Sequence, residues 1–357
     1  MKKFFRLTAM AFAGALLIAS GAASAEKLKV GFIYIGPPGD FGWTYAHDQG
    51  RMQIEKELGD RVETTFVENV PEGPDAERAI AKLAETGHEL IFTTSFGYME
   101  PTLKAAKRFP NVKFEHATGY KQADNVATYN AKFYEGRYVQ GVIAGKMSKT
   151  NTVGYIASFP IPEVIMGINA FLLGAHSVNP DIKLKIVWAY TWFDPPKEAD
   201  AAKVLMDQGA DIITQHTDST AALQAAAERN VLAFGQASDI IQFAPSTQLT
   251  SIIDEWGPYY VERTQAVLDG TWTSGDTWHG MSDGLVVMAP YTNMPDDVAT
   301  LAAETAKSIQ TGAFHPFTGP IYNQAGELVV PEGEVADDGM LAGMMFYVKG
   351  IDDEVPN

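Results

Sequence analysis

The chain has 357 residues, of which 46% are hydrophobic and 20% charged, so it can form two domains with hydrophobic cores. The formal net charge of -17 argues against nucleic acid or an anionic membrane surface as a partner. The absence of cysteine excludes disulfides, a thiol nucleophile and cysteine-ligated metal sites.

Residues 1–25 have the pattern of a secretory signal peptide. Three basic residues precede an apolar run at 7–18, and Ala23-Ser24-Ala25 matches an A-x-A cleavage site. An uncleaved anchor is the alternative, but the apolar run is short for a bilayer. No cysteine is available there for lipid attachment. We therefore expect a periplasmic protein that is secreted, cleaved and not lipid-anchored.

After this segment, the chain alternates strand patterns with helix patterns. Strands are predicted at 30–35, 62–70, 89–95, 112–118, 126–133, 153–158, 183–190, 211–215, 231–234 and 249–253. Helices are predicted at 44–58, 74–83, 101–109, 134–147, 163–176, 197–208, 219–229, 259–269 and 296–311. Residues 277–287 resemble one strand interrupted by glycines, and the tail from 312 resembles irregular connections with a small hairpin.

This order predicts an α/β fold with two Rossmann-like lobes, whose parallel sheets carry helices on both faces. We expect residues 26–130 and about 254–285 to form the N-terminal lobe. The C-terminal lobe then comprises 131–253 and about 286–357, and a hinge joins the two. In the helix at 134–147, Gly136, Gly141 and Gly145 are spaced for close packing.

The residues best suited to recognition follow the predicted strands, starting with the turn after 30–35. Ligands of open α/β sheets bind at the carboxyl ends of strands. Five such ends carry aromatic or hydrogen-bonding residues. They are Asp40, Phe41 and Trp43; Phe96, Gly97 and Tyr98; Tyr190, Trp192 and Asp194; His216 and Asp218; and Asp239. Aromatic rings could sandwich a flat ligand whose N–H groups donate to the carboxylates. A planar, nitrogen-rich, uncharged molecule is therefore expected in one cleft between the lobes.

Each of these residues also has a structural alternative. The aromatic residues could pack helices onto their neighbours, and Asp194 and Asp218 could each cap the helix that follows. His216 could be a structural histidine, and Tyr190 could point to either face of its strand. Asp239 is the better candidate, because no obvious helix starts after it.

The sequence carries none of the common catalytic motifs. It has no G-x-S-x-G, no H-E-x-x-H and no kinase motif set. The segment GVIAGK at 141–146 is one residue short of a phosphate loop and lies within a predicted helix. The seven histidines lack metal-ligand spacing. We predict a protein that is not an enzyme and has no cofactor or metal.

The ordered motifs resemble the BMP (basic membrane protein) family of ABC-transporter substrate-binding proteins. The similar segments are GDFGWTYAHDQG at Gly39, LIFTTSFGY at Leu90, FYEGRYVQGVIAGKM at Phe133, the stretch 179–213, GQASD at Gly235 and LTSIIDEW at Leu249. The resemblance implies a type I periplasmic-binding-protein fold and a purine ligand.

The resemblance also implies roles for individual residues. Phe41 and Trp192 match aromatic residues that stack on the base, and Asp239 matches an aspartate that hydrogen-bonds the purine edge. Phe96 and Gly97 match the second loop of the site.

Three departures from the family pattern point to a smaller ligand than a nucleoside. Gly42 stands where the family usually has Asn, and residues 216–219 replace a glycine-rich turn. Residues 252–254 lack the lysine that often reaches the ribose. Because sugar contacts are lost while Trp43 adds bulk, a free nucleobase such as adenine or guanine is expected.

We therefore predict a monomeric solute-binding protein that captures a small-molecule purine and passes it to an ABC permease in the inner membrane. One alternative is a purine nucleoside-binding protein of the same family. Another is a sensor that presents its ligand to a membrane receptor. The least favoured is a secreted nucleoside-processing enzyme that would use Asp40 or Asp239 as acid or base.

Overall fold

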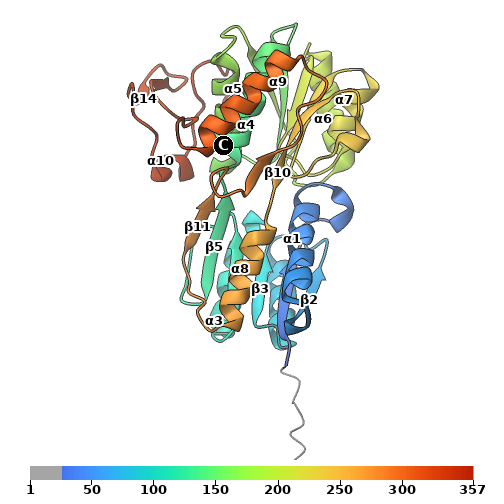
Figure 1. Cartoon of the computed structure of the whole chain (residues 1–357), viewed down its shortest axis with the longest axis vertical. Helices are drawn as coiled ribbons and strands as arrows, with labels where there is room; N and C mark the ends of the chain where they lie inside the picture. Colours follow the sequence, from blue (N-terminus) through green and yellow to red (C-terminus); the bar gives the residue numbers. More distant parts are fainter. Residues whose placement is uncertain (1–25, 357) are drawn as a thin grey trace, which may run out of the picture.

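The computed structural model describes residues 26–356 as an α/β protein built on two main sheets, stacked along the long axis of the molecule (Figure 1). The predicted signal peptide lies outside the described residues. The first sheet has the strand order β11-β5-β4-β3-β1-β2. Its strands are β1 (Leu28–Ile33), β2 (Val62–Val67), β3 (Leu90–Thr93), β4 (Lys113–Ala117), β5 (Val126–Ala131) and β11 (Asp276–His279). All neighbours in this sheet pair in parallel. We call the part of the molecule built on this sheet the first lobe.

The second sheet has the order β12-β10-β9-β8-β6-β7. Its strands are β6 (Thr152–Ala157), β7 (Lys183–Trp188), β8 (Ile212–Gln215), β9 (Leu232–Gly235), β10 (Gln248–Asp254) and β12 (Val286–Met288). Its pairs are parallel except for the antiparallel edge pair β10–β12. We call the part built on this sheet the second lobe. The predicted α/β fold with two parallel sheets is confirmed.

Helices cover the sheets in both lobes. In the first lobe they are α1 (Trp43–Leu58), α2 (Pro74–Glu85), α3 (Met99–Arg108) and α8 (Gly257–Leu268). In the second lobe they are α4 (Phe133–Met147), α5 (Pro162–His176), α6 (Pro195–Asp207), α7 (Ala221–Glu228), α9 (Asp296–Gln310) and α10 (Asp338–Ala342). Figure 1 shows α8 beside α1 in the lower half, although it follows most of the second lobe in the sequence. None of the helices within 26–356 combines the length and apolar character needed to span a membrane.

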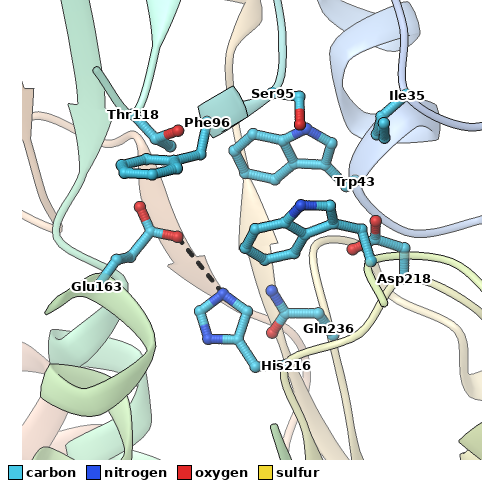
Figure 2. Close-up of a pocket in the computed structure, with 10 residues that line it drawn as sticks. Ile35, Trp43, Ser95, Phe96, Thr118, Glu163, His216, Asp218 and Gln236 are labelled. Atoms are coloured by element: carbon cyan, nitrogen blue, oxygen red, sulfur yellow. Dashed lines mark ion pairs between the residues drawn. The ribbon is translucent and has the colours of Figure 1, made fainter. Parts of the chain in front are cut away.

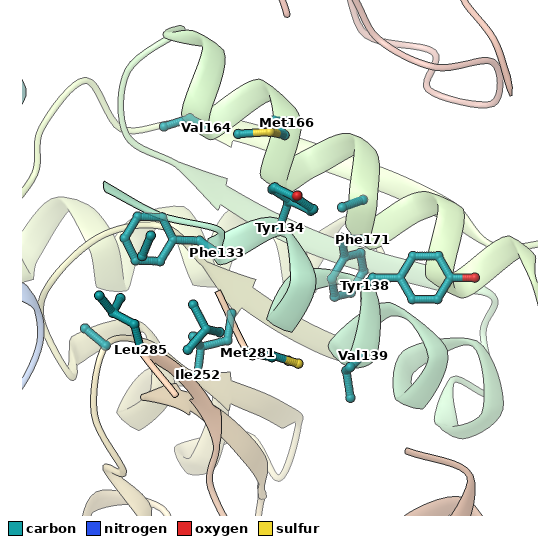
Figure 3. Packing of buried hydrophobic residues seen from close by; sticks show 14 of the residues in the cluster. Phe133, Tyr134, Tyr138, Val139, Val164, Met166, Phe171, Ile252, Met281 and Leu285 are labelled. Atoms are coloured by element: carbon teal, nitrogen blue, oxygen red, sulfur yellow. The ribbon is translucent and has the colours of Figure 1, made fainter. Parts of the chain in front are cut away.

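The core of the second lobe lies around α4 and α5 (Figure 3). Phe133 and Val139 on α4 and Phe171 on α5 are buried, together with Ile252 of the sheet. The two helices approach closely at Gly141, where an added β-carbon would lie 2.0 Å from the carbonyl oxygen of Phe171. The glycine spacing in this helix therefore serves close packing, as the sequence predicted.

The structure corrects the prediction for residues 277–287. They do not form one interrupted strand. They contain β11, which pairs with β5 of the first lobe, and β12, which pairs with β10 of the second. The glycines mark the passage between lobes: Gly284 has a φ of +76°. The expected terminal hairpin is present as β13 (Ile321–Tyr322) and β14 (Leu328–Val330).

Candidate functional site

A cavity of about 350 Å³ lies where the carboxyl ends of the two parallel sheets face each other (Figure 2). Residues from both lobes line it. They are Ile35, Trp43, Ser95, Phe96 and Thr118 from the first lobe, and Glu163, Trp192, His216, Asp218 and Gln236 from the second. The position agrees with the rule that ligands of α/β sheets bind beyond the carboxyl ends of the strands.

The first-lobe wall is aromatic and held by hydrogen bonds within that lobe. Trp43 begins α1, and its indole N–H donates to the carbonyl oxygen of Thr94 at 2.6 Å. Phe96 stands in a short 3-10 turn (Phe96–Tyr98) that directly follows Ser95. The Ser95 hydroxyl donates to Glu72 at 2.6 Å. The Trp43 ring is thus held by the protein itself, which lowers the entropic cost of binding.

Asp40 supports this wall without lining the cavity. Its carboxylate accepts hydrogen bonds from the backbone N–H groups of Gly42, Thr44 and Tyr45, at 2.8 to 3.0 Å. These groups belong to the start of α1, so Asp40 satisfies donors that a helix N-terminus leaves free. Burial raises the pKa of Asp40 to about 6, against the opposing effect of these hydrogen bonds.

The second-lobe wall is polar. Glu163 lies in the first turn of α5 and His216 follows β8, with 3.5 Å between Glu163 Oε1 and His216 Nε2. Burial lowers the pKa of His216, so the ring is neutral and its Nε2–H faces the carboxylate. Within the described part of the chain, Glu163 Oε2 and His216 Nδ1 have no hydrogen-bond partner. A buried acceptor without a partner is costly unless a ligand completes it.

Asp218 is the second carboxylate at the cavity. Its backbone N–H donates to the carbonyl oxygen of Trp192 at 2.9 Å, which joins two of the strand-end loops. Burial raises the pKa of the Asp218 carboxyl well above its usual range, and the negative charges of Asp40, Glu198 and Asp254 add to this effect. An N–H donor from a ligand would stabilise the ionised form of this carboxylate.

The two lobes touch each other beside the cavity. A β-carbon added at Gly42 would lie 2.0 Å from the carbonyl oxygen of Asp218. The hydroxyl of Ser238 donates to the carbonyl oxygen of Phe41. Only a residue without a side chain lets the loops meet at this distance. The structure therefore shows the lobes closed over the cavity.

Of the residues predicted to form the site, the structure brings Trp43, Phe96, Trp192, His216 and Asp218 to the cavity. It places others elsewhere. Phe41 packs against Tyr45 and Phe243, with ring centroids 5.3 and 4.9 Å apart. Tyr190 is 54% exposed to solvent. Both Phe41 and Tyr190 have left-handed backbone angles, with φ of 61° and 50°.

Three further predicted residues also lie away from the cavity lining. The backbone N–H of Gly97 donates to Glu72 at 2.9 Å. Tyr98 is fully buried, and its hydroxyl donates to the carbonyl oxygen of Val70. Asp239 is exposed and accepts hydrogen bonds from the backbone of Ile241 and the side chain of Gln248. Their positions indicate structural roles in the loops around the site.

Asp194 caps α6 by accepting from Lys197 N, the alternative left open in the sequence.

Sequence reasoning missed five lining residues: Ile35, Ser95, Thr118, Glu163 and Gln236. Four of them follow the same rule that found the others, because they stand at or just beyond strand ends. The sequence predicts that Glu163 begins a helix, where the helix dipole favours an acid without any ligand. Its position in the sequence could have revealed Glu163. It follows the loop after β6, and β6 ends at the same edge of the sheet as the strands that precede the other site residues.

The arrangement can hold a flat, uncharged molecule between aromatic rings and pair its N–H groups with carboxylates. Among the described residues, no group of three or more His, Asp or Glu could hold a metal ion. With the closed lobes, these features define a solute-binding protein of the type I periplasmic fold. A solved structure supports this fold. A solute-binding protein of an ABC transporter from Aeropyrum pernix K1 superposes with a TM-score of 0.70 at 19% identity, covering 88% of this chain and 95% of that one.

The chain belongs to the Bmp family. The family model, described as ABC transporter substrate-binding protein PnrA-like, matches residues 27–312. A purine-binding protein of Brucella abortus (strain 2308) is 67% identical over 337 residues, covering 94% of this chain and 96% of that protein. A Haloferax volcanii protein, named as a candidate glucose-binding component of an ABC transporter, is 35% identical over 94% of this chain and 83% of its own length. The resemblance found in the sequence motifs is confirmed.

Proposed function

We propose that this chain binds a free purine nucleobase, such as adenine or guanine, between its lobes and delivers it to an ABC permease. The observation that carries the proposal is the composition of the cavity. Aromatic side chains from both lobes line it together with the carboxyl groups of Glu163 and Asp218, and Glu163 Oε2 has no hydrogen-bond partner among the described residues. A purine has π-faces for the rings and N–H groups for the acceptors.

The closed lobes leave little free space around the cavity, which supports a base rather than a nucleoside. Asp254 stands in the region where the family resemblance implies a lysine that reaches the ribose. Here it is buried and does not line the cavity. The contact of Gly42 with Asp218 also narrows the space beside the site.

The chain passes between the two sheets at three places, at about 132, 255–256 and 280–285. We propose these connections as the hinge between the predicted lobes, 26–130 with about 254–285 and 131–253 with about 286–357. Closure about them would bury the base, and opening at the permease would release it. In this proposal the protein works as a monomer in the periplasm, after removal of residues 1–25 and without a lipid anchor.

Mass spectrometry of small molecules released on denaturation tests the proposal, together with calorimetric titration of refolded protein. We expect a purine base in the extract and tighter binding of adenine or guanine than of adenosine. Tighter binding of adenosine would show a nucleoside-binding protein. Binding of glucose without any purine would contradict the proposal and would indicate a sugar ligand, as in the name of the Haloferax relative.

A further inference from the structure

Gln236 lines the cavity, and a neighbouring arginine fixes its amide group. The Nη2 of Arg137 donates to the side-chain oxygen of Gln236. A guanidinium has only donors, so the amide oxygen must face Arg137 and the NH₂ must face away from it. Figure 2 shows the Gln236 nitrogen on the side of Glu163 and Trp43, and its oxygen on the opposite side.

Arg137 is itself held in place by the second lobe. It is fully buried on α4, and its Nη1 donates to Gln140 at 3.1 Å and to Thr214 at 3.3 Å. The guanidinium also lies over the ring of Tyr155, 5.6 Å from its centroid. Arg137 does not line the cavity. Contacts within the protein therefore orient the Arg137 guanidinium, and its hydrogen bond in turn orients the Gln236 amide.

The hydroxyl and carboxyl groups that line the cavity present acceptors. The hydroxyl hydrogens of Ser95 and Thr118 are used in bonds to Glu72 and to the carbonyl oxygen of Ala117. Glu163 Oε2 is an acceptor without a partner in the described chain. The Trp43 N–H is bound to Thr94. Gln236 therefore places an amide donor of fixed direction among oxygen acceptors.

We infer that Gln236 is a specificity-determining residue, which donates to a ring nitrogen or carbonyl oxygen of the ligand, and that Arg137 is the positioning residue that fixes this donor. The site then takes bases that turn N–H groups toward Glu163 and Asp218 and an acceptor toward Gln236. This inference rests on the proposed function, because it assumes a purine in the cavity.

The test asks whether the substitution Gln236→Glu changes how strongly the protein distinguishes adenine from analogues that each lack one ring nitrogen. In Gln236→Glu, Arg137 keeps an acceptor of the same size, but the cavity receives a second oxygen instead of the NH₂. Calorimetry would compare adenine with 1-deaza-, 3-deaza- and 7-deazaadenine in both proteins. We expect one analogue to bind the wild type at least 10-fold more weakly than adenine, and Gln236→Glu to reduce that difference to less than 3-fold.

Gln224→Glu, on the exposed face of α7, is the matched control and should leave every ratio unchanged. Arg137→Met should also reduce the ratio of the affinity for adenine to that for the discriminating analogue, because the Gln236 amide becomes free to turn. If that variant does not fold, Arg137→Lys, which still donates, should restore most of the wild-type ratio. Purine binding without coupling for any analogue would overturn this inference alone. Failure of the wild type to bind any purine would overturn the proposed function and this inference with it.

Discussion

The two lobes contribute to the cavity in different ways. The first-lobe groups have their hydrogen-bonding capacity used within the lobe: Trp43 donates to Thr94, Ser95 to Glu72, and Asp40 accepts from the start of α1. The second-lobe groups include atoms that lack partners in the described chain, among them Glu163 Oε2 and His216 Nδ1.

This difference separates two tasks in recognition. A wall that is complete in itself provides a rigid aromatic surface, and stacking on it depends little on which base is bound. A wall with unpaired acceptors discriminates, because a ligand that fails to complete them leaves buried polar groups unsatisfied. We therefore expect first-lobe substitutions to change affinity for all purines alike, and second-lobe substitutions to change preference among them.

The largest expected effect comes from the contact where the lobes meet. In Gly42→Ala, the added β-carbon would lie 2.0 Å from the carbonyl oxygen of Asp218, so the closed form could not be reached. Affinity for adenine should fall more than 100-fold in calorimetry, while thermal stability of the unliganded protein changes little. Gly39→Ala is the control, since its β-carbon would meet nothing within 4 Å and should leave affinity unchanged.

A smaller loss is expected from Asp218→Asn, which removes the acceptor charge at nearly constant volume. Hydrogen bonds to charged groups contribute about 1.5–3 kcal/mol, so affinity should fall about 50-fold. The loss should differ among purines. Asp239→Asn provides the comparison, because Asp239 is exposed and lies outside the cavity. Equal losses in the two variants would contradict the assignment of Asp218 to the site.

Trp43→Leu should weaken binding by about 10-fold, since one aromatic stack on a base contributes about 1–3 kcal/mol. The loss should be similar for adenine, guanine and hypoxanthine if the first lobe supplies affinity without selection. Phe41→Leu should have less than a 3-fold effect, because Phe41 packs on Tyr45 and Phe243 away from the cavity. A large loss for Phe41→Leu would restore the stacking role that the family resemblance implied.

The smallest effect on binding is expected at Asp40, whose influence is on stability. Its folded-state pKa is raised from 3.8 to about 6, so it contributes stability at low pH that is lost as the pH rises through about 6. The free energy of unfolding of the wild type, relative to Asp40→Asn, should fall by about 2 kcal/mol between pH 4 and pH 7. Urea unfolding at both pH values measures this change. A pH-independent difference would show that Asp40 titrates normally.

Much of the fold follows from the sequence because its signals are local. Hydrophobic periodicity and glycine stops indicated where α1 and α4 run, and buried apolar runs indicated strands such as β3. The same local signals gave a wrong prediction for residues 277–287. Their division between β11 and β12 depends on pairing with β5 and β10, which lie more than thirty residues away in the sequence.

The sequence by itself determined that polar and aromatic residues gather at the strand ends, since parallel strands place all their carboxyl ends at one edge. Tertiary structure decided which of these residues face the cavity. Phe41 and Tyr190 turn away because their backbone is left-handed, a conformation that the identity of a non-glycine residue does not reveal. Gln236 faces inward because it directly follows β9, which pairs with β8, and Glu163 because α5 begins at the cavity after the loop that follows β6. A side chain's direction depends on the whole packing around it, whereas its position along the chain does not.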